Sequence, residues 1–177
     1  RVLKNPWRPL VAVIGGVKIS TKIKLIKQFL KKADHVLLGG KIANPILAVK
    51  GIYLGTDWPE KEVEKEVKKL DLTSTKLHLP IDALASSDKS GKDYVRETSL
   101  GKIRRDELLL DIGPETIKFF SQIIKDAKMI VFSGPMGFFE NPKFENGTKE
   151  IAEIISRNHK AYKIAGGGDT LFALDKF

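Results

Sequence analysis

Short apolar runs rich in β-branched residues alternate along the chain with segments whose apolar residues recur every three or four positions. The recurring positions fall into four groups, namely Ile19, Ile23, Ile26 and Leu30; Val63, Val67 and Leu70; Ile117, Phe120 and Ile124; and Ile151, Ile154 and Ile155. This spacing is typical of amphipathic helices. The apolar runs between them predict strands at residues 10–14, 36–38, 76–81, 93–98, 108–112, 129–132 and 162–165.

Alternation of mostly apolar strands with helices predicts an α/β fold, a doubly wound (Rossmann-like), mostly parallel sheet with helices on both faces. Residues 86–101 break this rhythm with polar residues and glycines, and we expect a small β-hairpin inserted at the surface there. No internal repeat is visible. A length of 177 residues indicates one domain.

Composition narrows the chemistry. The chain contains no cysteine, which excludes disulfides, a thiol nucleophile and a cysteine zinc site. No apolar run is long enough to span a membrane, so we expect no membrane partner. The net charge of +9 favours phosphate-bearing partners. The basic residues are mostly lysines without interleaved aromatic residues, so a nucleic-acid binder is the less favoured alternative.

Four glycine-rich turns each follow a predicted strand and precede a predicted helix. They are Gly15-Gly16, Gly39-Gly40, Gly134-Pro135-Met136-Gly137 and Gly166-Gly167-Gly168. Ligands of open α/β sheets bind at the carboxyl ends of the strands, and glycine lets the backbone approach a ligand closely. A single turn of this kind is equally well explained as a tight turn that binds no ligand. Four along one edge indicate a ligand-binding edge.

Lys18 and Lys22 lie four residues apart at the start of the first predicted helix. Two cations are unfavourable at a helix N-terminus unless an anion sits there, because that end of the helix carries partial positive charge. The pair therefore predicts a phosphate site. The segment is not a Walker A loop, and no G-x-G-x-x-G fingerprint of a dehydrogenase follows the first strand.

Two carboxylates accompany the glycine turns. Asp169 follows the last of them, and two compatible interpretations apply to it, a helix N-cap and a ligand of a Mg²⁺ ion that bridges to phosphates. Glu140 ends the run that contains Gly134 and can accept the hydroxyls of a ribose. His35, His78 and His159 are far apart along the chain without metal-ligand spacing, and we interpret them as bystanders.

The runs RPLVAVIGGVKISTKI, LLGGKIAN, LPID, DIGPETI, FSGPMGFFE, KFENGT and IAGGGDT resemble, in order and spacing, the phosphoglycerate kinase family. The resemblance covers nearly all of the chain and points to the C-terminal, nucleotide-binding half of that two-domain enzyme. It implies a cytoplasmic, monomeric kinase of glycolysis. Its reaction moves a phosphoryl group from 1,3-bisphosphoglycerate to ADP, giving ATP and 3-phosphoglycerate, with Mg²⁺ as cofactor and no covalent protein intermediate.

The resemblance also implies roles for individual residues. Lys18, Gly167 and Gly168 are implied as catalytic, Lys18 as the lysine that follows the transferring phosphoryl group. Lys22 matches the lysine on the inner phosphates of ADP or ATP. Gly167, Gly168 and Thr170 match the helix-start amides and hydroxyl beside the nucleotide phosphates. Asp169 matches the carboxylate that places Mg²⁺, and Glu140 the acid that holds the ribose. The other nucleotide-binding positions implied are Gly15, Gly16, Gly39, Gly40, Ser133, Gly134, Pro135 and Gly166.

The chain departs from the family pattern in three places. Ser133 replaces an asparagine, Lys41 a third glycine and Val17 an alanine. The family's N-terminal domain, which holds the bisphosphoglycerate, and its last glycine-rich loop have no counterpart in these residues. The sequence begins at Arg1 without Met or a signal-peptide pattern, which suggests a processed or cut chain. We therefore expect a fragment inactive alone, and a non-catalytic nucleotide-binding module stays the alternative.

Overall fold

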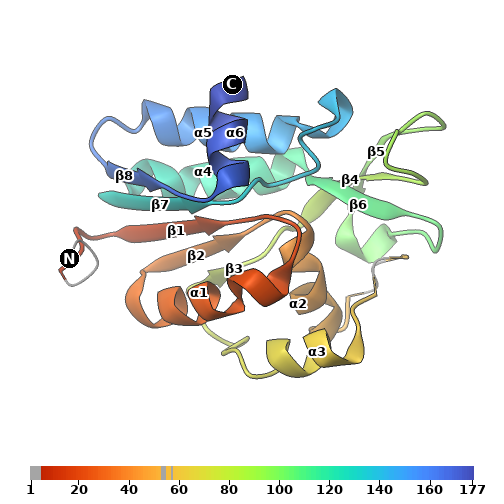
Figure 1. Cartoon of the computed structure of the whole chain (residues 1–177), viewed down its shortest axis with the longest axis horizontal. Coiled ribbons are helices and arrows are strands. Elements are labelled where there is room, and N and C mark those ends of the chain that lie inside the picture. The colour runs from red at the N-terminus through yellow and green to blue at the C-terminus, as the bar shows by residue number, and fades with distance from the viewer. Residues whose placement is uncertain (1–4, 53–54, 57) are drawn as a thin grey trace.

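The computed structural model describes residues 5–52, 55–56 and 58–177, and within them an α/β fold is formed around a five-stranded parallel sheet (Figure 1). The strand order is β3-β2-β1-β7-β8. The strands are β1 (Leu10–Ile14), β2 (His35–Leu38), β3 (Leu77–His78), β7 (Met129–Ser133) and β8 (Tyr162–Ala165). The predicted doubly wound sheet is confirmed.

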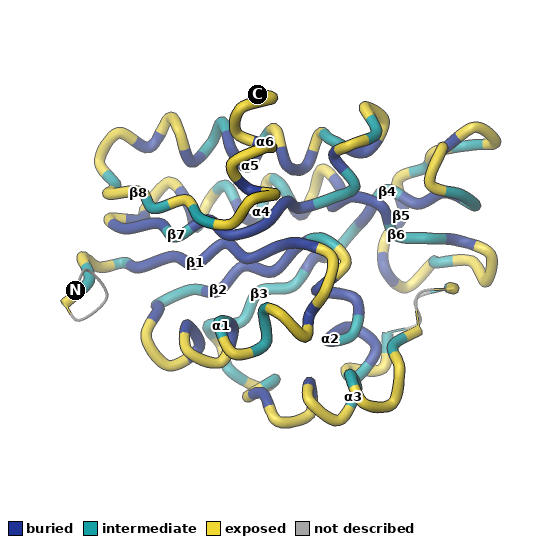
Figure 2. Tube along the Cα trace, viewed as in Figure 1, coloured by how far each residue is buried: buried dark blue, intermediate teal, exposed yellow. Residues whose placement is uncertain are grey.

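Helices cover both faces of this sheet. Helices α1 (Ile19–Lys32), α2 (Asn44–Val49) and α3 (Lys61–Val67) lie on one face, and α4 (Pro114–Asp126) and α5 (Asn146–Arg157) lie on the other (Figure 1). Strand β1 is buried on both sides, because Leu10, Ala12 and Ile14 pack into one core while Val11 and Val13 pack into the other. The buried sheet and the exposed outer faces of the helices are visible in Figure 2. No helix of the described residues is long and apolar enough to cross a membrane.

A second, antiparallel sheet of three strands lies beside the main sheet. It consists of β4 (Asp82–Ser86), β5 (Arg96–Ser99) and β6 (Leu108–Ile112), in the order β5-β4-β6. The Asp82 carboxylate joins this sheet to α4, because it accepts hydrogen bonds from the amides of Glu115 and Thr116 at 2.9 and 2.8 Å. These amides belong to the first turn of the helix, where no carbonyl of the helix is available to them.

This small sheet corrects three details of the sequence prediction. The inserted hairpin at 86–101 is part of a three-stranded sheet, whose third strand, β6, was expected in the main sheet. The strand expected at 76–81 is only two residues long, and β4 follows it unexpectedly. Pro80 lies between them and has no N–H to donate to a ladder, which explains the early end of β3. The strand expected at 93–98 begins later, at Arg96.

Three short 3₁₀ turns and a last helix complete the described chain. The 3₁₀ turns are η1 (Lys41–Ala43), η2 (Leu100–Lys102) and η3 (Pro142–Phe144), and the helix is α6 (Gly168–Lys176), which follows β8. Turn η1 follows the loop after β2, and η2 links β5 to the segment that leads into β6. Turn η1 therefore lies at the carboxyl edge of the main sheet and η2 beside the small sheet, and the candidate site is found between these two places.

Candidate functional site

The four glycine turns come together at one edge of the main sheet. They follow β2, β1, β7 and β8, which are consecutive neighbours in that sheet (Figure 1). Because all these strands run parallel, their carboxyl ends and the turns that follow lie on the same side. The sequence prediction that the turns share one edge is therefore confirmed.

Backbone hydrogen bonds connect these turns to one another. The amide of Gly16 donates to the carbonyl of Pro135 at 2.9 Å, and that of Gly40 donates to Met136 at 2.8 Å. A Cβ atom on Gly15 would overlap the Pro135 carbonyl, so only glycine permits this approach. The amides of Gly16 and Gly40 are thus engaged in hydrogen bonds that hold the turns together. Side chains and the N-terminal end of α6 remain to contact a ligand.

A cavity of about 380 Å³ opens between the start of α1 and the start of α6, and we call it the basic cavity. Its lining residues are Gly16, Val17, Lys18, Thr21, Lys22, Gly134, Gly167, Gly168, Asp169 and Thr170. Lys18 is exposed at the N-cap of α1. The Nζ atom of Lys22 donates to the Ser133 hydroxyl at 2.7 Å, which holds this ammonium group between α1 and β7.

The start of α6 forms the opposite wall of the basic cavity. The N-cap of this helix is Gly167, whose φ of 104° suits glycine, and Asp169 lies within the first turn. The reading of Asp169 as the cap is therefore wrong. The Thr170 hydroxyl accepts from the Gly134 amide at 2.6 Å and donates to the Gly166 carbonyl at 2.9 Å, so it joins the turns after β7 and β8.

A second cavity, of about 250 Å³, lies between the glycine turns and the small sheet, and we call it the apolar cavity. Leu100, Leu108 and Leu109 form its wall on the small-sheet side. Glu140 is exposed and lines it as well. From the main sheet and its turns come Gly16, Gly40, Lys41, Pro135, Met136 and Gly137. Its size and lining suit a flat apolar group with a few polar atoms.

The two cavities adjoin, because Gly16, Val17 and Asp169 line both of them. One cavity offers two lysines and a helix N-terminus, which attract a polyanion. The other offers leucine side chains and a carboxylate. The arrangement therefore fits a ligand that carries an apolar ring at one end and phosphates at the other.

Most of the residues singled out in the sequence line one or both cavities. The exceptions are Gly15, Gly39, Ser133 and Gly166, which line neither. A Cβ on Gly15 or Gly39 would overlap the Pro135–Met136 segment, and Ser133 contacts Lys22. These four residues therefore contribute to the shape of the edge through packing and hydrogen bonding, without lining either cavity.

Sequence reasoning missed the small-sheet wall and a buried carboxyl at its end. Asp111 lines the apolar cavity and accepts from the Gly147 amide, at the start of α5, at 2.7 Å. Burial raises the pKa of Asp111 to about 8, although hydrogen bonds from Gly147 and Ile112 favour the charged form. The acidic residue inside an otherwise apolar strand, Leu-Leu-Leu-Asp-Ile, was the available signal.

The histidines are not all isolated as the sequence suggested. His35 Nδ1 and His78 Nε2 lie 3.0 Å apart at the start of β2 and the end of β3, and the His78 ring meets Phe119 edge-on. Burial and the neighbouring His35 lower the pKa of His78. This pair lies outside both cavity linings. Among the described residues, no group of three or more metal-ligating side chains gathers anywhere.

An α/β domain with a basic and an apolar cavity side by side at its strand ends belongs to the broad class of ligand-binding doubly wound folds. Comparison with known proteins narrows the class. A family model described as phosphoglycerate kinase matches residues 1–177. The chain belongs to the phosphoglycerate kinase family.

Individual relatives agree with this assignment. The phosphoglycerate kinase of Desulfovibrio desulfuricans is 36% identical over 181 residues, covering 100% of this chain and 46% of the relative. That of Desulfosudis oleivorans is 38% identical over 179 residues, covering 98% and 45%. The solved phosphoglycerate kinase of Coxiella burnetii is similar with a TM-score of 0.91 and 37% identity, covering 99% of this chain and 46% of the other. The chain thus spans about half the length of the relatives it matches.

Proposed function

We propose that this chain is the C-terminal, nucleotide-binding domain of a phosphoglycerate kinase. In this proposal ADP or ATP binds along the glycine-turn edge, with its phosphates in the basic cavity and its adenosine in the apolar cavity. The observation that carries the proposal is the contiguity of the two cavities through Gly16, Val17 and Asp169. Membership of the kinase family supports the same ligand.

Each charged residue has a role that follows from its place. Lys18 is exposed at the mouth of the basic cavity and neutralises charge on the transferring phosphoryl group. Lys22, held by Ser133, binds the inner phosphates. The Glu140 carboxylate accepts hydrogen bonds from the ribose hydroxyls. The amides of Gly167 and Gly168 lie at the N-terminal end of α6, where the partial positive charge of the helix favours phosphate oxygens.

Mg²⁺ suits this donor set. The Asp169 carboxylate is exposed where the two cavities meet, and Mg²⁺ is commonly held by one or two carboxylates, phosphate oxygens and water. Asp169 would hold the ion. When bound, Mg²⁺ would neutralise charge on the phosphates and orient them for transfer.

The whole reaction needs a second domain. We propose that this domain binds 3-phosphoglycerate or 1,3-bisphosphoglycerate and closes over the edge that carries Lys18. Phosphoryl transfer depends on positioning and on charge neutralisation, so the nucleotide half alone holds one reactant only. We expect no turnover from this chain by itself. Turnover in a coupled assay after addition of a family N-terminal domain would distinguish the kinase from a non-catalytic nucleotide-binding module.

Calorimetric titration with ADP, with and without Mg²⁺, tests the nucleotide site. We expect Lys22→Ala to weaken ADP binding about tenfold or more, because a charge-assisted hydrogen bond to phosphate contributes about 1.5–3 kcal/mol. Lys27→Ala is the matched control, since Lys27 is an exposed lysine of the same helix outside both cavities. Equal affinity of the Lys22 variant and the parent, or no binding of ADP at millimolar concentration, would contradict the proposal.

A further inference from the structure

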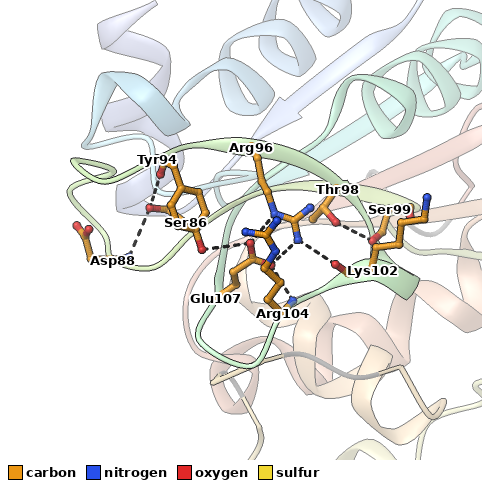
Figure 3. Close-up of polar contacts among 9 residues, drawn as sticks. All are labelled: Ser86, Asp88, Tyr94, Arg96, Thr98, Ser99, Lys102, Arg104 and Glu107. Atoms are coloured by element: carbon orange, nitrogen blue, oxygen red, sulfur yellow. Dashed lines mark hydrogen bonds and ion pairs between the residues drawn. The ribbon is translucent and has the colours of Figure 1, made fainter.

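Glu107 is a fully buried carboxylate immediately before β6, whose first residue, Leu108, lines the apolar cavity. Arg96 holds it with both arms of its guanidinium group, Nε donating to Oε1 at 2.5 Å and Nη2 donating to Oε2 at 2.7 Å (Figure 3). The Arg104 amide and the Tyr94 hydroxyl donate to the same carboxylate at 2.8 and 3.2 Å. Four donors therefore satisfy this buried charge.

The ion pair joins two segments that are separate in the small sheet. Arg96 belongs to β5, and its Nη2 atom also donates to the carbonyl of Lys102 at 2.9 Å, at the end of η2 (Figure 3). Leu100 of η2 and Leu108, the residue after Glu107, both line the apolar cavity. One guanidinium group thus fixes the two segments that carry these leucines.

The hydrogen-bond ladder between β4 and β6 does not by itself fix the position of the leucine wall of the apolar cavity. The pairing of β4 with β6 shifts register between Leu84 and Ala85, so that Leu110 of β6 has no direct partner on β4. Such an irregularity bends the strand and weakens the local ladder. The Glu107 carbonyl accepts a further hydrogen bond from the Thr56 amide at 3.2 Å. Contacts at Glu107 therefore supply a constraint next to a segment where the ladder is irregular.

We propose that the Arg96–Glu107 ion pair is a positioning element that presses Leu100 and Leu108 against the nucleotide base. This inference rests on the proposed function, because it assigns the base to the apolar cavity. The basic cavity is lined by the turns after β1, β7 and β8 and by α1 and α6, without any residue of the small sheet. Loosening the ion pair therefore weakens the contribution of the base to affinity and spares that of the phosphates.

The test compares ADP with inorganic diphosphate, which carries the phosphates but no base. Both ligands are titrated by calorimetry into the 177-residue chain and into two variants, Glu107→Gln and Arg96→Lys. Glu107→Gln removes the charge, whereas Arg96→Lys keeps the charge but loses the two-armed geometry. The control is Glu153→Gln, which breaks the exposed Arg157–Glu153 pair on α5, away from both cavities.

We expect both small-sheet variants to bind ADP about tenfold more weakly, roughly the effect of removing one well-packed aliphatic contact from the base. Their affinity for diphosphate should stay within about twofold of the parent, a difference of under 0.5 kcal/mol, because no residue of the small sheet lines the basic cavity. The control leaves both affinities unchanged. Diphosphate binding at parental affinity also shows that a variant is folded, and if Glu107→Gln does not fold, Arg96→Lys decides the question.

Two results overturn the inference while leaving the proposed function intact. One is unchanged ADP affinity in a folded variant, and the other is an equal loss for ADP and diphosphate, which is what a merely structural ion pair would give. A parent chain that binds neither ligand overturns the proposed function itself, and this inference falls with it.

Discussion

The buried carboxyl of Asp111 makes the stability of this domain depend on pH in an unusual direction. The pKa of Asp111 is raised from 3.8 to about 8, so between these values the folded state holds a proton that the unfolded state has lost. Stability therefore falls as pH rises through this window, by up to about 1.4 kcal/mol per pH unit. We expect a loss of about 2 kcal/mol between pH 6 and pH 7.5 from this residue.

The variant Asp111→Asn isolates the effect, because asparagine has nearly the same shape and does not titrate. Free energies of unfolding from urea titrations at pH 6, 6.75 and 7.5 should decline in the parent chain and stay nearly level in the variant. Asp126→Asn, at an exposed aspartate near the end of α4, is the control and should decline as the parent does. Parallel declines in the parent and the Asp111 variant would refute the reasoning, since they would show that the buried carboxyl is charged throughout.

Two further predictions concern the frame of the site and the histidine pair. Thr170→Val should cost about 1–3 kcal/mol of stability in urea unfolding and also weaken ADP binding, because it leaves the buried Gly134 amide, 2.6 Å from the lost hydroxyl, without an acceptor; unchanged stability would contradict this. His78 has a lowered pKa, so the folded state resists its protonation and stability falls as pH drops below about 6.5. His78→Asn should reduce this loss of unfolding free energy between pH 6.5 and pH 5, whereas His159→Asn, at an exposed histidine, should not. Identical unfolding free energies of the parent and His78→Asn across this pH range would exclude the effect.

The main sheet was predictable because its sequence signals are local and agree with its final environment. Strands such as β1 are apolar at every position, and the helices after them carry stripes with helical spacing, which together require a sheet covered on both faces. The small sheet was harder to predict, since an apolar run like β6 reads the same in a parallel core as beside a cavity. Which sheet it joins depends on contacts of Arg96 and Asp82, whose partners Glu107 and Thr116 lie 11 and 34 residues away in sequence.

The candidate site was predictable to the extent that chain order determines where turns fall. Four glycine turns after parallel strands must share one edge, and this brought Lys22 and Thr170 to the same cavity. Their proposed roles at the nucleotide stay predictions. The leucine wall and Asp111 were missed because they come from a sheet whose position no local pattern specifies. The contact between His35 and His78, 43 residues apart in sequence, depends on the pairing of β2 with β3 in the same way.

The strand order has a consequence for how the chain acquires its fold during synthesis. β1 pairs early with its neighbour β2, but its other partner is β7, which begins more than a hundred residues later. Until α4 and α5 emerge from the ribosome, one whole face of the nascent sheet and one edge of β1 are bare. Such a half-built sheet exposes apolar surface and unpaired strand groups, so it is prone to aggregate. Chaperone demand in the cell should therefore concentrate in the interval before Asn146–Arg157 is synthesised.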